Sequence, residues 1–138
     1  MIILDTCVIS EALKPSPSAA VLNWIDTLPE ERVYIPSLVL GELRKGIDLL
    51  PSGSKKQSFT LWLEQLQERF KGRILIFDVE TSLVWGALSA RLQKEGKTAP
   101  VVDSLIAAHA LKNHALLATR NIQDYENTGV DLLNPWQD

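Results

Sequence analysis

The stretch Met1-Ile2-Ile3-Leu4-Asp5 decides the fold of this chain. Four apolar residues stop on a carboxylate, which is the pattern of a buried strand with an acidic residue at its C-terminal end. In an open parallel α/β sheet, ligands bind outside the carboxyl ends of the strands. Asp5 is therefore the first candidate for a functional residue.

The rest of the chain alternates short apolar runs with longer helical patterns. Strands are predicted at residues 2–5, 33–36, 73–77, 115–119 and 130–133. Helices are predicted at residues 8–13, 19–28, 38–50, 55–70, 81–93 and 101–113, with Ser37 and Thr81 as candidate N-caps. Such alternation indicates βαβ units with right-handed crossovers. The expected fold is a three-layer α/β/α sandwich with a central, mostly parallel sheet of about five strands.

Length and composition describe one ordinary globular domain, expected to span residues 1–138. The chain is 46% hydrophobic and 22% charged, and a single cysteine, Cys7, excludes an internal disulfide. We therefore expect a cytoplasmic protein without a membrane span, since no apolar stretch approaches about 20 residues. The net charge of −3 argues against a basic nucleic-acid coat but not against a nuclease, because divalent cations reverse the field of an acidic site.

Three further acidic residues follow Asp5 at positions that lead to the same sheet edge. Glu42 lies near the start of the helix after the second strand, and Asp103 lies in the first turn of its helix, next to Pro100. Asp124 follows the fourth strand in a predicted loop. Carboxylates that converge repel one another unless a cation neutralises them, and oxygen ligands alone suit Mg²⁺ or Mn²⁺ better than zinc.

Each of these acids also has an ordinary interpretation. Asp5 is a possible turn former or helix cap, and Glu42 is a possible surface partner of Lys45. Asp103 suits a helix first turn for its dipole alone, and Asp124 suits any loop. The set of four is more specific than its members. Four supporting residues adjoin them: Thr6, Thr119, Asn121 and Arg120. The Thr6 hydroxyl is expected to orient Asp5 by a hydrogen bond, and Arg120 is a possible phosphate contact.

Several blocks of sequence, in a fixed order over the whole chain, carry a family resemblance. They are Ile3-Leu4-Asp5-Thr6, Glu42-Leu43-Arg44-Lys45-Gly46, Val102-Asp103-Ser104-Leu105-Ile106, Ala118-Thr119-Arg120-Asn121 and Asn134-Pro135-Trp136. The chain resembles PIN-domain proteins, and among them the VapC/FitB-type toxins of bacterial type II toxin–antitoxin pairs. The resemblance implies a Mg²⁺- or Mn²⁺-dependent endoribonuclease that cuts RNA with a metal-activated water. It also implies a cognate antitoxin, with operator DNA bound only through that antitoxin.

The resemblance carries over residue by residue to Asp5, Glu42 and Asp103. The fourth position departs from it, because Asn121 stands where some relatives have an acid and Asp124 comes three residues later. Asn121 would hold a water through its amide oxygen, whereas Asp124 would supply charge. Cys7 departs as well, since the family often has Asn or Ser there; we interpret it as a small buried side chain.

Other functions remain open at this point. An aspartyl-phosphate phosphatase needs a second acid two residues after Asp5, where Cys7 stands, and a receiver domain needs paired acids before its first helix. A catalytically weak PIN-like binding module within an antitoxin–DNA complex is the main alternative.

His109 and His114 are expected in core or surface roles. Three tryptophans in helical patterns, Trp24, Trp62 and Trp85, suggest surplus apolar surface and hence a homodimer.

Overall fold

The computed structural model describes residues 1–137, and these form a five-stranded sheet in the order β3-β2-β1-β4-β5. All four strand pairs are parallel. The predicted parallel sheet is therefore confirmed, with strands that are mostly shorter than expected. They are β1 (Ile2–Leu4), β2 (Val33–Pro36), β3 (Ile74–Leu75), β4 (Leu116–Ala118) and β5 (Asp131–Leu133).

Strand β1 lies at the centre of the sheet and holds its apolar core. Ile3 pairs with Tyr34 of β2 on one side and with Leu117 of β4 on the other. Ile3 and Leu117 are fully buried because helices cover both faces of the sheet. This is why the first strand reads as a continuous apolar run rather than as an alternation.

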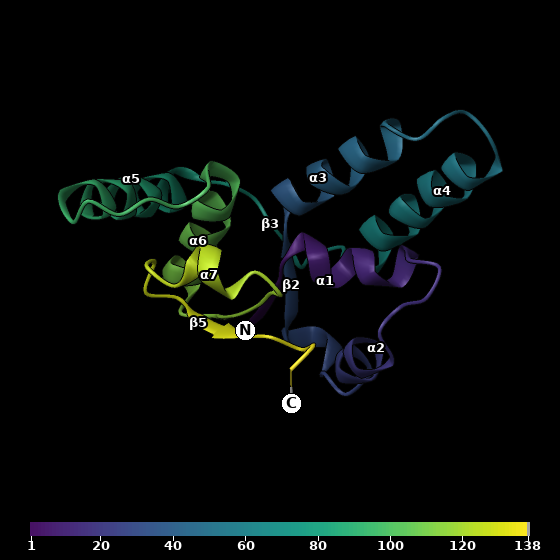
Figure 1. Cartoon of the computed structure of the whole chain (residues 1–138), viewed down its shortest axis with the longest axis horizontal. Helices are drawn as coiled ribbons and strands as arrows, with labels where there is room; N and C mark the ends of the chain where they lie inside the picture. Colours follow the sequence, from purple (N-terminus) through teal and green to yellow (C-terminus); the bar gives the residue numbers. More distant parts are fainter. Residues whose placement is uncertain (138) are drawn as a thin grey trace.

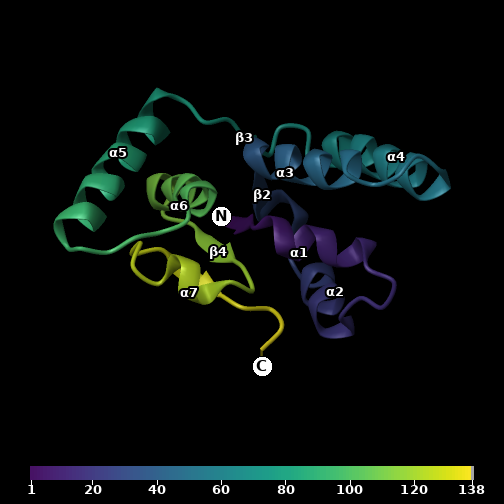
Figure 2. The same ribbon diagram turned by 45° about the horizontal axis from the view of Figure 1, so that its top comes forward.

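Two helical layers enclose the sheet, as the predicted three-layer sandwich requires. Figures 1 and 2 show α1 to α4 together on one side and α5, α6 and α7 on the other. The helices are α1 (Thr6–Ser10), α2 (Ala19–Asp26), α3 (Ser37–Asp48), α4 (Ser54–Arg69), α5 (Val79–Lys94), α6 (Val101–Asn113) and α7 (Ile122–Tyr125). In the described part of the chain, none is long and apolar enough to cross a membrane.

The strand order creates a switch point between β1 and β4. The chain leaves β1 toward β2 over one face of the sheet, and it returns from β3 to β4 over the other face. Such a reversal opens a crevice at the carboxyl ends of the two strands, where α/β proteins bind ligands. Asp5 follows β1 and Thr119 follows β4, and the Asp5 amide donates to the Ala118 carbonyl at 3.0 Å. Both residues therefore line the crevice.

Several predicted boundaries were wrong. The first helix begins at Thr6, with Asp5 as its N-cap, and continues as a 3₁₀ turn η1 (Glu11–Leu13). Helix α5 begins at Val79 because Asp78, rather than Thr81, caps it: Oδ1 of Asp78 accepts from the Thr81 amide at 2.8 Å. Ser37 lies inside α3 and provides no side-chain cap. The predicted loop that contains Asp124 is the short helix α7.

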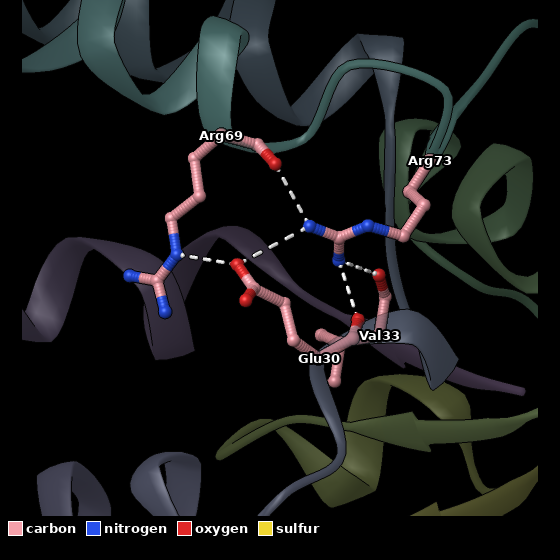
Figure 3. Close-up of polar contacts among 4 residues, drawn as sticks. All are labelled: Glu30, Val33, Arg69 and Arg73. Atoms are coloured by element: carbon pink, nitrogen blue, oxygen red, sulfur yellow. Dashed lines mark hydrogen bonds and ion pairs between the residues drawn. The ribbon is translucent and has the colours of Figure 1, made fainter.

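Arg73 joins the start of β3 to the neighbouring elements although this strand has only two residues. Its guanidinium donates to the carbonyl oxygens of Glu30, Val33 and Arg69 at 2.7, 2.6 and 2.8 Å (Figure 3). These carbonyls belong to the 3₁₀ turn η2 (Glu30–Arg32), the start of β2 and the end of α4. One guanidinium thus provides hydrogen-bond donors to backbone carbonyls of a turn, a strand and a helix. The clamp fixes β2, from which α3 carries Glu42 to the crevice.

Candidate metal centre

Asp5 is the anchor of the site. Its side chain is buried, with 4% of the residue exposed, and both carboxylate oxygens are bonded. Oδ1 accepts from the Thr6 amide at 2.8 Å, and Oδ2 accepts from the Thr119 hydroxyl at 2.8 Å and from the Tyr125 hydroxyl at 3.1 Å. Donors from three segments thus hold one carboxylate in a single orientation.

Tyr125 joins Asp5 to Asp103. Its hydroxyl lies 3.3 Å from Oδ1 of Asp103, and the ring is fully buried beneath the two acids. Burial raises the pKa of Tyr125, and the charges of Asp5 and Asp103 raise it further, so the phenol stays protonated and acts as a donor. Sequence reasoning missed this residue. The available signal was a tyrosine next to Asp124, since a buried tyrosine hydroxyl usually has a polar partner.

Glu42 reaches the site through Thr6. The Thr6 hydroxyl donates to Oε1 of Glu42 at 2.6 Å, and Glu42 is half-buried in the second turn of α3. We expected the Thr6 hydroxyl to orient Asp5 instead. The correction has a simple cause: as the first residue of α1, Thr6 gives its backbone amide to Asp5, which leaves the hydroxyl free for a different carboxylate.

The segment after β4 brings the remaining predicted residues. The Thr119 hydroxyl, which donates to Asp5, also accepts from the Asn121 amide at 3.0 Å. The Arg120 amide donates to Sγ of Cys7 at 3.4 Å, so this half-buried thiol links α1 to the segment that follows β4. Asp124 is exposed in α7. All eight predicted residues therefore lie at the carboxyl edge of the sheet.

Electrostatics tie the four acids together. The pKa of Asp103 is raised from 3.8 to about 6, first by burial and then by the negative charges of Asp5, Asp124 and Glu42. A hydrogen bond from Tyr125 opposes this rise. Asp103 therefore carries a proton part of the time near neutral pH. A cation would remove both the repulsion and the proton.

The donor set fits a hard divalent cation better than it fits zinc. The side chains that act on Asp5 and Asp103 are carboxylates and hydroxyls, which offer oxygen atoms as ligands. Within residues 1–137, however, no three His, Cys, Asp or Glu side chains are arranged to hold an ion directly. Mg²⁺ commonly takes one or two carboxylates and keeps several waters. Asp5 and Asp103 would be the direct ligands, while Glu42 and Asp124 would act through water.

Both histidines lie in the structural roles that we expected. His109 is buried in α6 and meets the ring of Phe77 edge-on at 5.3 Å between centroids. His114 is exposed and ends α6 in the left-handed conformation, with φ 50°.

Of the three tryptophans, Trp24 and Trp62 pack against the core, so they do not supply the exposed apolar surface that we expected from them.

Comparisons with known proteins identify the family of the chain. The PIN domain family matches residues 2–128. The VapC ribonuclease Y4jK of Sinorhizobium fredii is 38% identical over 99% of this chain and 99% of its own. The toxin FitB of Neisseria gonorrhoeae is 38% identical over 100% of both chains.

Solved structures give the same result. FitAcB from Neisseria gonorrhoeae matches with a TM-score of 0.95 and 37% identity over 100% of both chains. VapBC2 from Rickettsia felis, bound to a DNA fragment from its promoter, matches with a TM-score of 0.81 and 28% identity over 97% of this chain and 98% of that chain. The chain therefore belongs to the PIN-domain family, and within it to the group of the VapC and FitB toxins.

Proposed function

We propose that this chain is the toxin of a toxin–antitoxin pair and acts as a Mg²⁺- or Mn²⁺-dependent endoribonuclease. The observation that carries the proposal is Asp103, whose pKa is raised by Asp5, Asp124 and Glu42 at the switch point of the sheet. Four acids that repel one another in one crevice are expected where a bound cation offsets their negative charge. Relatives named as VapC ribonucleases support RNA as the substrate.

Each residue of the acidic crevice has a separate role in the proposed reaction. When bound, the divalent ion supplies a Lewis acid that neutralises phosphodiester charge and lowers the pKa of a water. Asp5 is held by Thr6, Thr119 and Tyr125, so it is ready to bind without reorganisation. Asp103 would be ionised in the presence of a bound cation, because the positive charge would offset the negative charges that raise its pKa. Glu42 and Asp124 orient water at the sides of the crevice.

A cognate antitoxin is the proposed partner. The solved relatives include FitAB bound to the IR36 DNA fragment, and VapBC2 bound to promoter DNA. This chain has a net charge of −3, so contact with operator DNA is expected to come through the antitoxin. An arginine of the antitoxin would pair with the same carboxylates that hold the cation, because guanidinium groups form bidentate bonds with carboxylates.

One observation favours the alternative of a catalytically weak binding module. Tyr125 lies between Asp5 and Asp103, and no ready cluster of three His, Cys, Asp or Glu side chains is present in residues 1–137. A site that never gathers its acids around an ion would still present a negative crevice to an antitoxin. Metal-dependent turnover separates the two functions.

The decisive experiment is RNA cleavage by the purified chain, free of antitoxin, with Mg²⁺ or Mn²⁺ and with a chelator. We expect cleavage only with the metal. Asp5→Asn should lower it at least a hundredfold, while Asp26→Asn, an exposed acid at the end of α2, should leave it unchanged. Equal cleavage by the wild type and the Asp5→Asn protein would refute the enzymatic function. Circular dichroism of both variants checks that the fold is intact.

A homodimer is proposed as well, through α5, one of the three helices whose tryptophans suggested it. Val79 and Leu83 of α5 are 77% and 71% exposed, and they are four residues apart on one helical face. Gly86, Ala87 and Ala90 are also exposed and extend this apolar stripe along the helix. A contiguous exposed apolar stripe of this kind is typical of a protein–protein contact surface.

A further inference from the structure

A polar groove adjoins the acidic crevice at the carboxyl ends of β4 and β5. Its volume is about 370 Å³, and four side-chain amides line it: Asn121, Gln123, Asn134 and Gln137. We call it the amide groove. Arg120 and Asp124 complete its polar lining. Because Asp124 also acts on Asp103, the groove and the acidic crevice share a wall.

The size and chemistry of the amide groove suit a nucleobase. Ligand sites in proteins range from roughly 300 to 1,000 Å³, so the groove has room for one small planar group. An amide offers a donor and an acceptor side by side, and Asn or Gln can bond adenine through both. Unpaired bases of single-stranded RNA expose the edges that such amides read. A groove with four amides and one cation is poorly suited to a purely apolar ligand.

Arg120 is held in place at the side of the groove. Its guanidinium carbon lies 5.2 Å from the ring centroid of Trp136, a cation–π contact. The backbone on both sides is anchored too, because the Arg120 amide bonds to Cys7 and the Trp136 amide donates to Oδ1 of Asn134 at 2.9 Å. Arg120 is nevertheless exposed, so its outer face is open to a ligand.

Arg120 brings a positive charge to the amide groove. The acidic crevice repels a phosphodiester until a cation is bound, and the whole chain is negative. Among the described residues that line the amide groove, Arg120 is the one basic side chain. The planar guanidinium matches the oxygens of a phosphate, and its contact with Trp136 reduces the entropy lost on binding.

We propose that the amide groove is a nucleotide subsite for single-stranded RNA. It reads one base next to the cleaved phosphodiester, with adenine as the expected base, through Asn121, Gln123 and Gln137. Arg120, held on Trp136, pairs with the phosphate of that nucleotide. The inference rests on the proposed ribonuclease function, because it names how the same site selects its RNA.

Binding of RNA without turnover tests the role of Arg120. Fluorescent single-stranded RNA oligonucleotides are titrated with full chains that all carry Asp5→Asn, which suppresses cleavage, and anisotropy is measured. Arg120→Gln should weaken binding about tenfold, and Arg120→Lys should recover only part of it, because lysine lacks the planar fork. The control is Arg32→Gln, which removes the same charge from an exposed position in η2. Equal affinities of Arg120→Gln and Arg32→Gln would overturn the inference.

Four oligonucleotides that differ at one position test base reading. The Asp5→Asn chain should prefer adenine at that position about tenfold, and added Gln123→Ala should remove the preference while it keeps the affinity for the weakest base. A preference that survives Gln123→Ala would overturn the subsite, and so would an Asp5→Asn chain that binds none of the four. The proposed function fails separately, if the wild type with Mn²⁺ cuts no RNA.

Discussion

The hydroxyl of Tyr125 lies 3.1 Å from Oδ2 of Asp5, and this bond determines how the acidic crevice behaves without a cation. The same hydroxyl is 3.3 Å from Oδ1 of Asp103, yet it has only one proton to donate. When both acids are ionised, one of them faces the phenol oxygen without a donor. A proton on Asp103 removes that conflict, which agrees with the raised pKa of Asp103.

The raised pKa of Asp103 makes this residue destabilising at neutral pH. Its pKa is 3.8 as an ordinary aspartate and about 6 in the fold, so between these values the folded state binds more protons. The stability contribution of Asp103 is complete below pH 4 and is lost as the pH rises through 6. Asp103→Asn should therefore raise the free energy of unfolding at pH 7 by about 1 kcal/mol, a value reduced because Asp103 is only half-buried.

Urea unfolding at pH 7 and at pH 4 measures this effect. The gain from Asp103→Asn should vanish at pH 4, and Asp131→Asn, an exposed acid of β5, should show no gain at either pH. Addition of Mn²⁺ should stabilise the wild type but not the Asp103→Asn protein. A variant less stable than the wild type at pH 7 would contradict the electrostatic account.

Tyr125→Phe should impair catalysis through the position of Asp5. The carboxylate of Asp5 would lose one of its donors, so we expect kcat to fall about tenfold while KM for RNA changes little. The hydrogen bond from Tyr125 also lowers the pKa of Asp103, so its loss should move the acidic limb of the pH–rate profile to higher pH. Tyr34→Phe, a half-buried tyrosine of β2, is the matched control. An unshifted profile would mean that Tyr125 only fills space.

Asp124 and Asn121 are the two candidates for the fourth ligand position of the site. Of these two residues, Asp124 is the one whose charge raises the pKa of Asp103. Asp124→Asn should therefore increase the Mn²⁺ concentration for half-maximal cleavage several-fold and move the acidic limb of the pH–rate profile to lower pH. Asn121→Ala should leave the metal dependence unchanged. Cleavage assays across a Mn²⁺ series and a pH series decide the matter. If neither substitution shifts the metal dependence, three acids form the site.

The apolar stripe on α5 should hold a homodimer together. Leu83→Glu puts a charge within the stripe, at a position that is 71% exposed, so the particle in light scattering should fall from twice 15.4 kDa to 15.4 kDa. Leu61→Glu on α4, at a position that is 53% exposed, should leave the dimer intact. A wild type that remains at 15.4 kDa at micromolar concentration would contradict the proposal.

Inhibition by an antitoxin tail should be a competition between an arginine and the cation. An arginine-containing tail peptide should bind the metal-free chain and lose affinity as Mg²⁺ or Mn²⁺ increases. Asp103→Asn should weaken this binding as well, since it removes one of the carboxylates that the guanidinium contacts. Calorimetry across a metal series provides the measurement. Binding that responds to neither change would mean that the antitoxin acts elsewhere.

The sequence by itself determined the class of the fold and the edge of the sheet at which the predicted acids lie. The run Met1–Leu4 is apolar throughout because β1 is buried on both faces, and such a run needs no knowledge of its neighbours to be recognised. Parallel strands must also end on one side of the sheet, so residues after β1 and β4 were expected to meet there. Asp5, Glu42 and Asp103 became candidates because each stands near the end of a predicted strand or the start of a predicted helix.

Only the tertiary structure decided how those residues meet. Nothing local to Tyr125 indicates that its hydroxyl reaches Asp5, a residue 120 positions away in sequence. The pairing of Thr6 with Glu42 and the cation–π contact of Arg120 with Trp136 depend likewise on how separate elements pack. Periodicity records which face of an element is buried, whereas hydrogen bonds between side chains depend on distances of a few tenths of an ångström that arise only when the layers close on the sheet.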